Sequence, residues 1–209
     1  RADIETRRYE TYADLERYMR GSAVAVGNMM TAVMDPEDPE AARPHAQALG
    51  EAFQLTNFLR DVREDIDERD RIYLPWETLD AYGVTEEQVR NGELTPGFVT
   101  AMQSELARTE ERYREGVAGI SYLPEDCQFP VLLASVLYAD HHRLIRERGF
   151  DVLSATPQLS RRRKLALVAR TYWHWWRTRD PAAVFHGVTG VSQTDPHHRH
   201  PGIPDPVPR

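Results

Sequence analysis

The segment from Phe53 to Pro75, FQLTNFLRDVREDIDERDRIYLP, combines regularly spaced polar side chains with a helix-like apolar pattern. At about 100° per residue, the other members of the polar set lie within roughly 60° of Gln54 on one helix face. The apolar side chains form a second face roughly 110° away, beside the polar face and not opposite to it. This arrangement predicts polar side chains at the edge of a cavity in the core. The polar face consists of Gly50, Gln54, Asn57, Asp61 and Asp65, and the apolar face of Leu55, Leu59, Val62 and Ile66.

The polar face has the side chains needed to bind a metal and a diphosphate. Asp61 and Asp65 are spaced i and i+4, so their carboxylates repel each other on a helix. A divalent cation removes this repulsion, and Mg²⁺ is commonly held by one or two carboxylates while phosphate oxygens and water complete its coordination. Gln54 and Asn57 offer amide groups to a diphosphate oxygen or a metal-bound water, and Arg60 offers a bidentate donor. The pattern therefore indicates metal-assisted departure of diphosphate.

The alternative interpretation of a D-x-x-x-D pair is a solvated helix face. We interpret the other acidic pairs with this spacing in that way. Asp61 and Asp65 differ from them because amide side chains and a small glycine lie in register, with an apolar face alongside. These features favour a binding site for this pair alone. The other pairs are Glu10/Asp14, Glu64/Glu68 and Glu111/Glu115.

Helical patterns that position this segment cover most of the chain. Helix caps, prolines and glycines divide it into expected helices joined mainly by short connectors. No segment reads convincingly as a strand and no internal repeat is present, so we predict an all-α fold. We expect one helical domain over residues 1–185 and a disordered tail, rich in Gly, Pro, His and Ser, over residues 186–209. The expected helices are 11–34, 44–67, 85–92, 95–123, 130–149 and 160–179.

The composition narrows the classes of partner and compartment. The 209 residues contain 33 acidic and 26 basic side chains, a net charge of −7, which argues against a nucleic-acid partner. The single Cys127 excludes an intramolecular disulfide and fits a reducing compartment. The sequence contains no run of about 18 apolar residues, the length needed to span a bilayer. We therefore expect a cytoplasmic protein. An aromatic cluster, Tyr172, Trp173, Trp175 and Trp176, is compatible with core packing or with peripheral contact at a membrane.

Three segments resemble, in the same order, motifs of the phytoene/squalene synthase family. QLTNFLRDVREDIDERDRIYLP resembles the family's second aspartate-rich motif, which is highly specific. YMRGSAVAVGNMM, from Tyr18 to Met30, is similar to the family's Y-x-x-G-x-A-x-x-x-G helix. VLYADHHRLIRERGFDVLSATPQLSRRRKL resembles its Y-x-x-x-L…GYDV…K segment. The similarity runs from about Asp3 to Leu165.

The resemblance implies an isoprenoid-synthase-type helical bundle around a central apolar cavity, with this chain as its C-terminal portion. The family's first D-x-x-x-D motif has no counterpart, and we expect it to precede Arg1. Mg²⁺ or Mn²⁺ is the implied cofactor. The implied roles are Asp61 and Asp65 as catalytic metal ligands, Gln54, Asn57 and Arg60 around the substrate diphosphate, and Tyr18 and Tyr138 as catalytic residues lining the active site.

The implied reaction is the head-to-head joining of two prenyl diphosphates. From this resemblance we expect condensation of two geranylgeranyl diphosphates into phytoene, without NAD(P)H. A squalene or dehydrosqualene synthase acting on farnesyl diphosphate is the nearest alternative, because chain length depends on cavity depth. A non-catalytic relative acting as a scaffold subunit is an alternative from another class.

Overall fold

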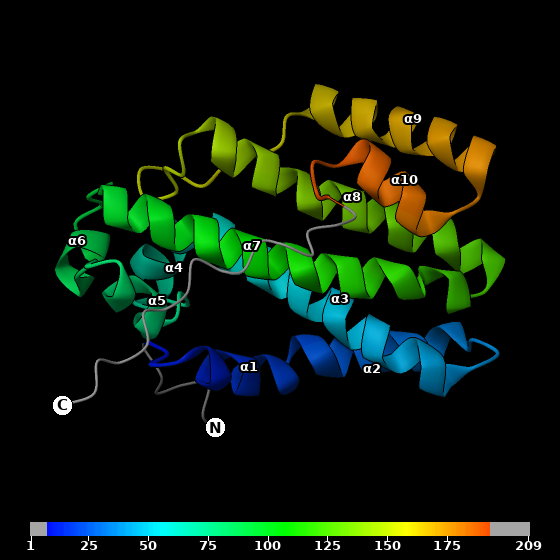
Figure 1. Ribbon diagram of the computed structural model, residues 1–209, viewed down its shortest axis with the longest axis horizontal. Helices are drawn as coiled ribbons and strands as arrows, with labels where there is room; N and C mark the ends of the chain where they lie inside the picture. The colour runs from blue at the N-terminus through cyan, green and yellow to red at the C-terminus, as the bar shows by residue number, and fades with distance from the viewer. Residues whose placement is uncertain (1–7, 193–209) are drawn as a thin grey trace.

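The computed structural model describes residues 8–192, which form an all-α fold, as predicted. Within this range the only β-type pairing is an isolated bridge between Arg8 and Ile72. Figure 1 shows long helices packed side by side, with short helices gathered at one end of the bundle. The elements are α1 (Tyr12–Arg20), α2 (Ala23–Met34), α3 (Pro39–Arg60), α4 (Val62–Arg69), α5 (Trp76–Ala81), α6 (Glu86–Arg90), α7 (Pro96–Ala118), η2 (Gly119–Tyr122), α8 (Glu125–Glu147), α9 (Arg161–Thr178) and α10 (Pro181–Val188).

Side-chain caps fix where several of these helices begin. Thr11 accepts from the backbone N–H of Asp14, whose carboxylate accepts from the Thr11 N–H, a reciprocal capping box at the start of α1. Asp38 caps α3, which begins with Pro39, so α3 starts earlier than the predicted 44–67 helix. Ser160 caps α9 in the same way. These polar residues stop each helix from extending into the preceding loop.

Helix α3 is the central element because α2, α7 and α8 all pack against it. Glycines allow this close packing. A Cβ at Gly27 of α2 would lie 2.5 Å from the Ala46 carbonyl oxygen of α3. A Cβ at Gly116 of α7 would lie 2.8 Å from the Cα of Leu49. The small residues of α2 are thus used for helix–helix contact at backbone distance.

A buried polar network joins α3, α7 and α8 across the core. The Thr56 hydroxyl of α3 lies 2.9 Å from the Tyr113 hydroxyl and 3.0 Å from His142 Nε2. His142 Nδ1 lies 3.3 Å from Glu110 Oε1, which also accepts from Arg146 at 2.8 Å. Burial of the ring lowers the His142 pKa, so the imidazole is neutral at pH 7. The network fixes the rotation of α3 against two neighbours.

Several predicted boundaries were wrong. The expected 44–67 helix is interrupted at Asp61, and the expected 11–34 helix is interrupted around Ser22, whose φ and ψ are −123° and −85°. The tail predicted from residue 186 begins too early. Helix α10 continues to Val188, and the side chains of Val188 and Val191 are buried in the core, which orders this segment. Residues 193–209 lie outside the described range.

We expect Gly116→Ala to destabilise the protein by about 1–3 kcal/mol, because the new methyl group has no room against Leu49. Thermal unfolding measures this as a drop in Tm. Gly187→Ala is the matched control, since a Cβ there meets nothing within 4 Å and α10 should gain up to about 1 kcal/mol of helix propensity. Equal Tm values for the two variants would contradict the packing described for α3 and α7.

Candidate functional site

Asp61 joins helices α3 and α4. Its backbone (φ −99°, ψ 17°) departs from helical geometry and ends α3 at Arg60. The hydrogen-bond ladder nevertheless continues, because the Asp61 N–H donates to the Asn57 carbonyl and the Asp65 N–H donates to the Asp61 carbonyl, both at 2.8 Å. Asn57, Asp61 and Asp65 therefore remain one turn apart, as the sequence predicted. The local break does not disperse the polar face.

The Asp61 carboxylate is held by its neighbour Arg60. The guanidinium donates from Nε and Nη2 to the two carboxylate oxygens, each at 2.6 Å, in a bidentate pair. The Asp61 side chain is 14% exposed and that of Arg60 24% exposed, so the pair is shielded from bulk solvent. An incoming anion could therefore recruit the guanidinium while a cation takes the carboxylate.

Asp65 is the most strongly perturbed carboxyl group of the site. Its residue is 5% exposed, and Arg69 donates to it from one turn later in α4. Burial raises the pKa of Asp65 to about 6, and the negative charges of Asp61 and Glu64 add to the increase, while Arg69 opposes it. A negative charge on Asp65 is thus held where it is poorly solvated.

Gln54 and Asn57 complete the polar face. Both are half-buried on α3, and neither side chain makes a hydrogen bond to another residue within 8–192. Half-buried amide groups without protein partners can bind a polar ligand or water.

Aromatic rings from other helices flank the polar face on both sides. Tyr138 of α8 stacks on Phe53 of α3 with ring centroids 4.7 Å apart. On the other side, Phe58 of α3 stacks on Tyr73 at 4.0 Å, and Tyr18 of α1 lies 5.9 Å from Tyr73. The two tyrosines chosen from the sequence therefore reach α3 from opposite sides, through Phe53 and Phe58. The "RIYLP" segment is buried packing, since Tyr73 is 7% exposed.

An apolar cavity of about 340 Å³ lies farther toward the start of α3. It opens to the surface and is lined by residues of α2, α3, α7, η2 and α8, among them Val26, Met30, Ala46, Phe53 and Val131. Gly50, the small member of the predicted polar face, lines the cavity, and the lining reaches Phe53. The polar side chains of the face, which begin at Gln54, lie beyond the cavity along the chain and are not among its lining residues.

The site supplies some, but not all, of the ligands that a hard divalent cation requires. Within residues 8–192, no group of three or more His, Cys, Asp or Glu side chains is arranged to hold a metal ion. Two carboxylates one turn apart nevertheless suffice for Mg²⁺ when phosphate and water supply the remaining ligands. Burial, together with the nearby charges of Asp61 and Glu64, disfavours the ionised form of Asp65, and a bound cation would offset that cost.

Sequence reasoning missed several residues around the site. It did not anticipate that Arg69 would pair with Asp65, although the i,i+4 spacing was visible. It assigned no role to Phe53 and Phe58, which carry the aromatic flanks. The buried network that joins His142 to Thr56 could not be foreseen, because its members come from three helices.

We expect Asp65→Asn to stabilise the metal-free protein at pH 7 by about 1–3 kcal/mol. The folded state binds the Asp65 proton more tightly than the unfolded chain, so stability falls as pH rises from about 4 to about 6. The amide removes that dependence, and the difference from the wild type should vanish below about pH 4. Thermal unfolding across this range, with exposed Asp67→Asn as control, measures it. A less stable Asp65→Asn at pH 7 would contradict the raised pKa.

Known proteins match this chain over most of its length. The family described as squalene/phytoene synthase matches residues 1–163. A phytoene synthase from Thermus thermophilus is 36% identical over 170 residues, covering 81% of this chain and 57% of that protein. A 15-cis-phytoene synthase from Synechococcus elongatus is 35% identical over 176 residues, covering 79% of this chain and 57% of that protein.

Solved structures share the fold. A dehydrosqualene synthase crystallised with a ligand superposes with a TM-score of 0.76 at 29% identity, covering 83% of this chain and 61% of that chain. A squalene synthase from Alicyclobacillus acidocaldarius gives a TM-score of 0.68 at 25% identity, covering 72% and 56%. The chain spans a little over half the length of the curated relatives named above. The isoprenoid-synthase-type helical bundle predicted from the sequence is therefore confirmed, and the chain belongs to the squalene/phytoene synthase family.

Proposed function

We propose that the protein containing this chain is a prenyltransferase that condenses two molecules of geranylgeranyl diphosphate head to head into phytoene and releases diphosphate. The observation that carries the proposal is the division of the α3–α4 segment into an apolar part that lines a cavity and a polar part with paired carboxylates. A prenyl diphosphate has the same two parts, a long apolar chain and an anionic head. The relatives named as phytoene synthases support this choice of substrate.

The polar groups at the end of α3 and the start of α4 would bind the diphosphate head. Asp61 and Asp65 would hold Mg²⁺ or Mn²⁺, which supplies Lewis-acid stabilisation of the departing diphosphate when bound. Arg60 lies beside Asp61 and can turn its guanidinium to phosphate oxygens when the carboxylate binds a cation. Gln54 and Asn57 contribute amide donors to the same oxygens, because neither is engaged elsewhere within the described chain. Together these groups would orient the head at the end of the cavity.

The aromatic flanks would protect the carbocation that remains after diphosphate departs. Tyr138 with Phe53, and Tyr18 with Phe58, present ring faces on the two sides of the polar face. Ring faces attract cations, and an apolar enclosure excludes the water that would quench them. The cavity beyond Phe53 would hold part of the prenyl chain. Phytoene formation releases diphosphate and a proton with no net oxidation or reduction, so no nicotinamide cofactor is expected.

A dehydrosqualene- or squalene-forming reaction on farnesyl diphosphate is the second candidate. The structural similarity to a dehydrosqualene synthase, at a TM-score of 0.76, favours it. Dehydrosqualene formation uses the same head chemistry and differs in the length of chain that the cavity must accept, whereas squalene formation also requires a hydride donor such as NADPH.

Product analysis distinguishes the two substrates. We expect the full-length protein with Mg²⁺ to convert geranylgeranyl diphosphate into phytoene with a kcat/KM at least about tenfold above that for farnesyl diphosphate, a difference of roughly 1.4 kcal/mol in transition-state binding. Chromatography of products from each diphosphate measures it. A preference for the shorter substrate would select the second candidate.

We expect Asp61→Asn to lower kcat/KM of the full-length protein at least about 100-fold, on the order of 3 kcal/mol, because a neutral amide holds a divalent cation poorly. Asp67→Asn is the matched control. It makes the same change two residues after Asp65 on the exposed side of α4, where Asp67 pairs with Arg63. Unchanged turnover in Asp61→Asn would rule out a metal-binding role for this carboxylate.

A further inference from the structure

Helix α9 carries an exposed apolar stripe along its outer side. Leu165, Val168, Tyr172 and Trp176 follow one another at intervals of three or four residues, the spacing of one helix face. Their side chains are between 36% and 71% exposed, and Trp173 beside them is 52% exposed. The opposite side of α9 is buried against α8 and α10. The helix is therefore apolar on the side that faces away from the bundle as well as on the side that packs.

The same helix is strongly basic in an acidic protein. Residues 161–179 contain six arginines, one lysine and no acidic residue. The rest of the chain has 19 basic against 33 acidic residues. Arg161, Arg162 and Lys164 are exposed and form no ion pair with an acidic group in the part of the chain that the structure describes. Arg177 lies 4.7 Å from the centre of the Trp173 ring, so cations and aromatic rings are interleaved.

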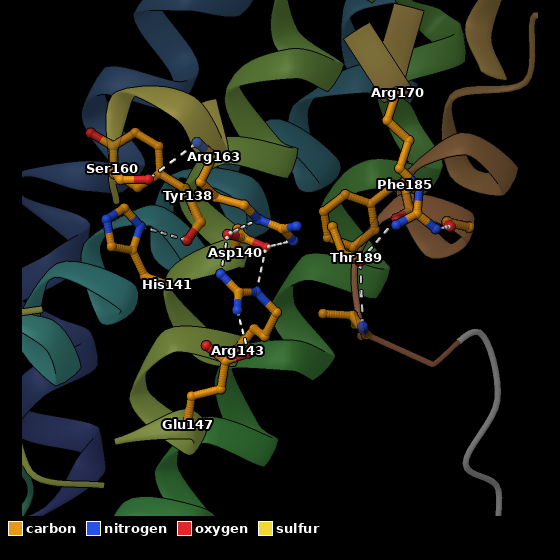
Figure 2. Close-up of polar contacts among 12 residues, drawn as sticks. Tyr138, Asp140, His141, Arg143, Glu147, Ser160, Arg163, Arg170, Phe185 and Thr189 are labelled. Carbon is orange, nitrogen blue, oxygen red and sulfur yellow. Dashed lines mark hydrogen bonds and ion pairs between the residues drawn. The ribbon is translucent and has the colours of Figure 1, made fainter. Parts of the chain in front are cut away.

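Ion pairs and hydrogen bonds hold α9 rigidly in this position. The buried Asp140 of α8 accepts from Arg163 at 2.6 Å and from Arg143 at 3.1 Å, which secures the first turn of α9 (Figure 2). Arg170 donates to the Gly187 carbonyl of α10 at 2.7 Å, which secures its middle. Figure 1 shows α9 along one edge of the bundle, with α8 and α10 on its inner side. The exposed stripe is thus a fixed surface.

We propose that the outer face of α9 docks onto the surface of a bilayer containing anionic lipids. Exposed Trp, Tyr and Leu side chains enter the boundary between headgroups and acyl chains, and surrounding arginines bind lipid phosphates. This mode is contact in the plane of the surface. In the described residues no helix is long and apolar enough to cross a membrane.

Charge complementarity selects a lipid surface over a second copy of the chain. Two copies meeting through this face about a two-fold axis would bring identical stretches together, each with seven cations and no anion. Such an interface would have no opposing charge to offset the repulsion. An anionic bilayer offers that charge together with an apolar layer for Leu165, Tyr172 and Trp176.

The docked face also lies close to the apolar cavity. Phe129 of α8 contacts Tyr172 edge-on, with ring centroids 5.9 Å apart, and Trp175 at 6.2 Å. The next residues of α8, Pro130 and Val131, line the cavity. A membrane held against α9 would therefore lie a few side chains from the space that the proposed prenyl chain occupies. Vesicle binding is measured without turnover, so it can fail or succeed independently of the proposed reaction.

The test is co-sedimentation of the protein with vesicles of phosphatidylglycerol and phosphatidylcholine, and with vesicles of phosphatidylcholine alone. We expect binding to the anionic vesicles, weakened by salt. The apolar variant Leu165→Ser/Tyr172→Ser/Trp176→Ser and the charge variant Arg161→Gln/Arg162→Gln/Lys164→Gln should each lower the partition coefficient at least about tenfold.

Matched controls make the same changes elsewhere on the surface. Val33→Ser/Leu94→Ser/Tyr122→Ser removes exposed apolar groups outside α9, and Arg17→Gln/Arg20→Gln/Arg43→Gln removes three exposed arginines. Each control should change partitioning less than about twofold. Equal losses in control and α9 variants would overturn the proposal. A dimeric wild type that the apolar α9 variant converts to monomer, without vesicle binding, would also overturn it.

Tryptophan fluorescence of the wild-type protein tests the same surface, and this measurement does not require that a multiply substituted variant folds. Anionic vesicles containing brominated acyl chains should quench the tryptophan emission, because Trp173 and Trp176 are exposed on α9. Trp76→Phe should leave the quenching unchanged, since Trp76 lies on α5, at the other end of the bundle from α9 (Figure 1). Absence of quenching with bound vesicles would show that another surface makes the contact and would overturn the assignment to α9.

Discussion

The close packing of α3 against its neighbours is the constraint on which the site depends. Gly27 and Gly116 bring the backbones of α2 and α7 against α3, and the Thr56 network sets its rotation. With position and rotation fixed, the half-buried amides and the carboxylates lie on one face by helix geometry alone, and Arg60 reaches Asp61 from beside that face. If α3 were packed less tightly, it could rotate about its axis, and its polar side chains would then point in another direction. Tight packing in the first half of α3 thus positions the polar groups of the second half.

The charge arrangement of the site opposes stability and favours ligand binding. Asp65 is buried near Asp61, and its pKa is raised to about 6, so ionisation at pH 7 costs folding free energy. Arg69 offsets part of this cost through a charge-assisted hydrogen bond to Asp65, and Arg60 makes a bidentate pair with Asp61. The same residues supply charges of both signs that a cation and a diphosphate could recruit together. Unfavourable electrostatics without ligand is a common property of binding sites.

The sequence predicted what depends on local periodicity and missed what depends on contact between distant helices. The one-turn spacing of Asn57, Asp61 and Asp65 follows from helix geometry and survived the break at Asp61. The break itself was not foreseen, because no proline or glycine marks it. Helix α10 was taken for part of a connector and a tail because Pro181 and Gly187 resemble loop residues, whereas tertiary burial of Val184, Phe185 and Val188 stabilises it.

The cavity and the polar face lie in sequence along α3, and this order restricts how a ligand can bind. Phe53 lines the cavity and Asp61 lies eight residues later, about 12 Å along the helix axis. A ligand with its anionic head at Asp61 can reach the cavity only if its chain runs along α3 past Gln54 and Asn57. The rings stacked on Phe53 and Phe58 then border the bond between head and chain. Short polar diphosphates would bind the proposed head site without using the cavity, so under the proposed function the apolar half of α3 would supply selectivity for a long apolar chain.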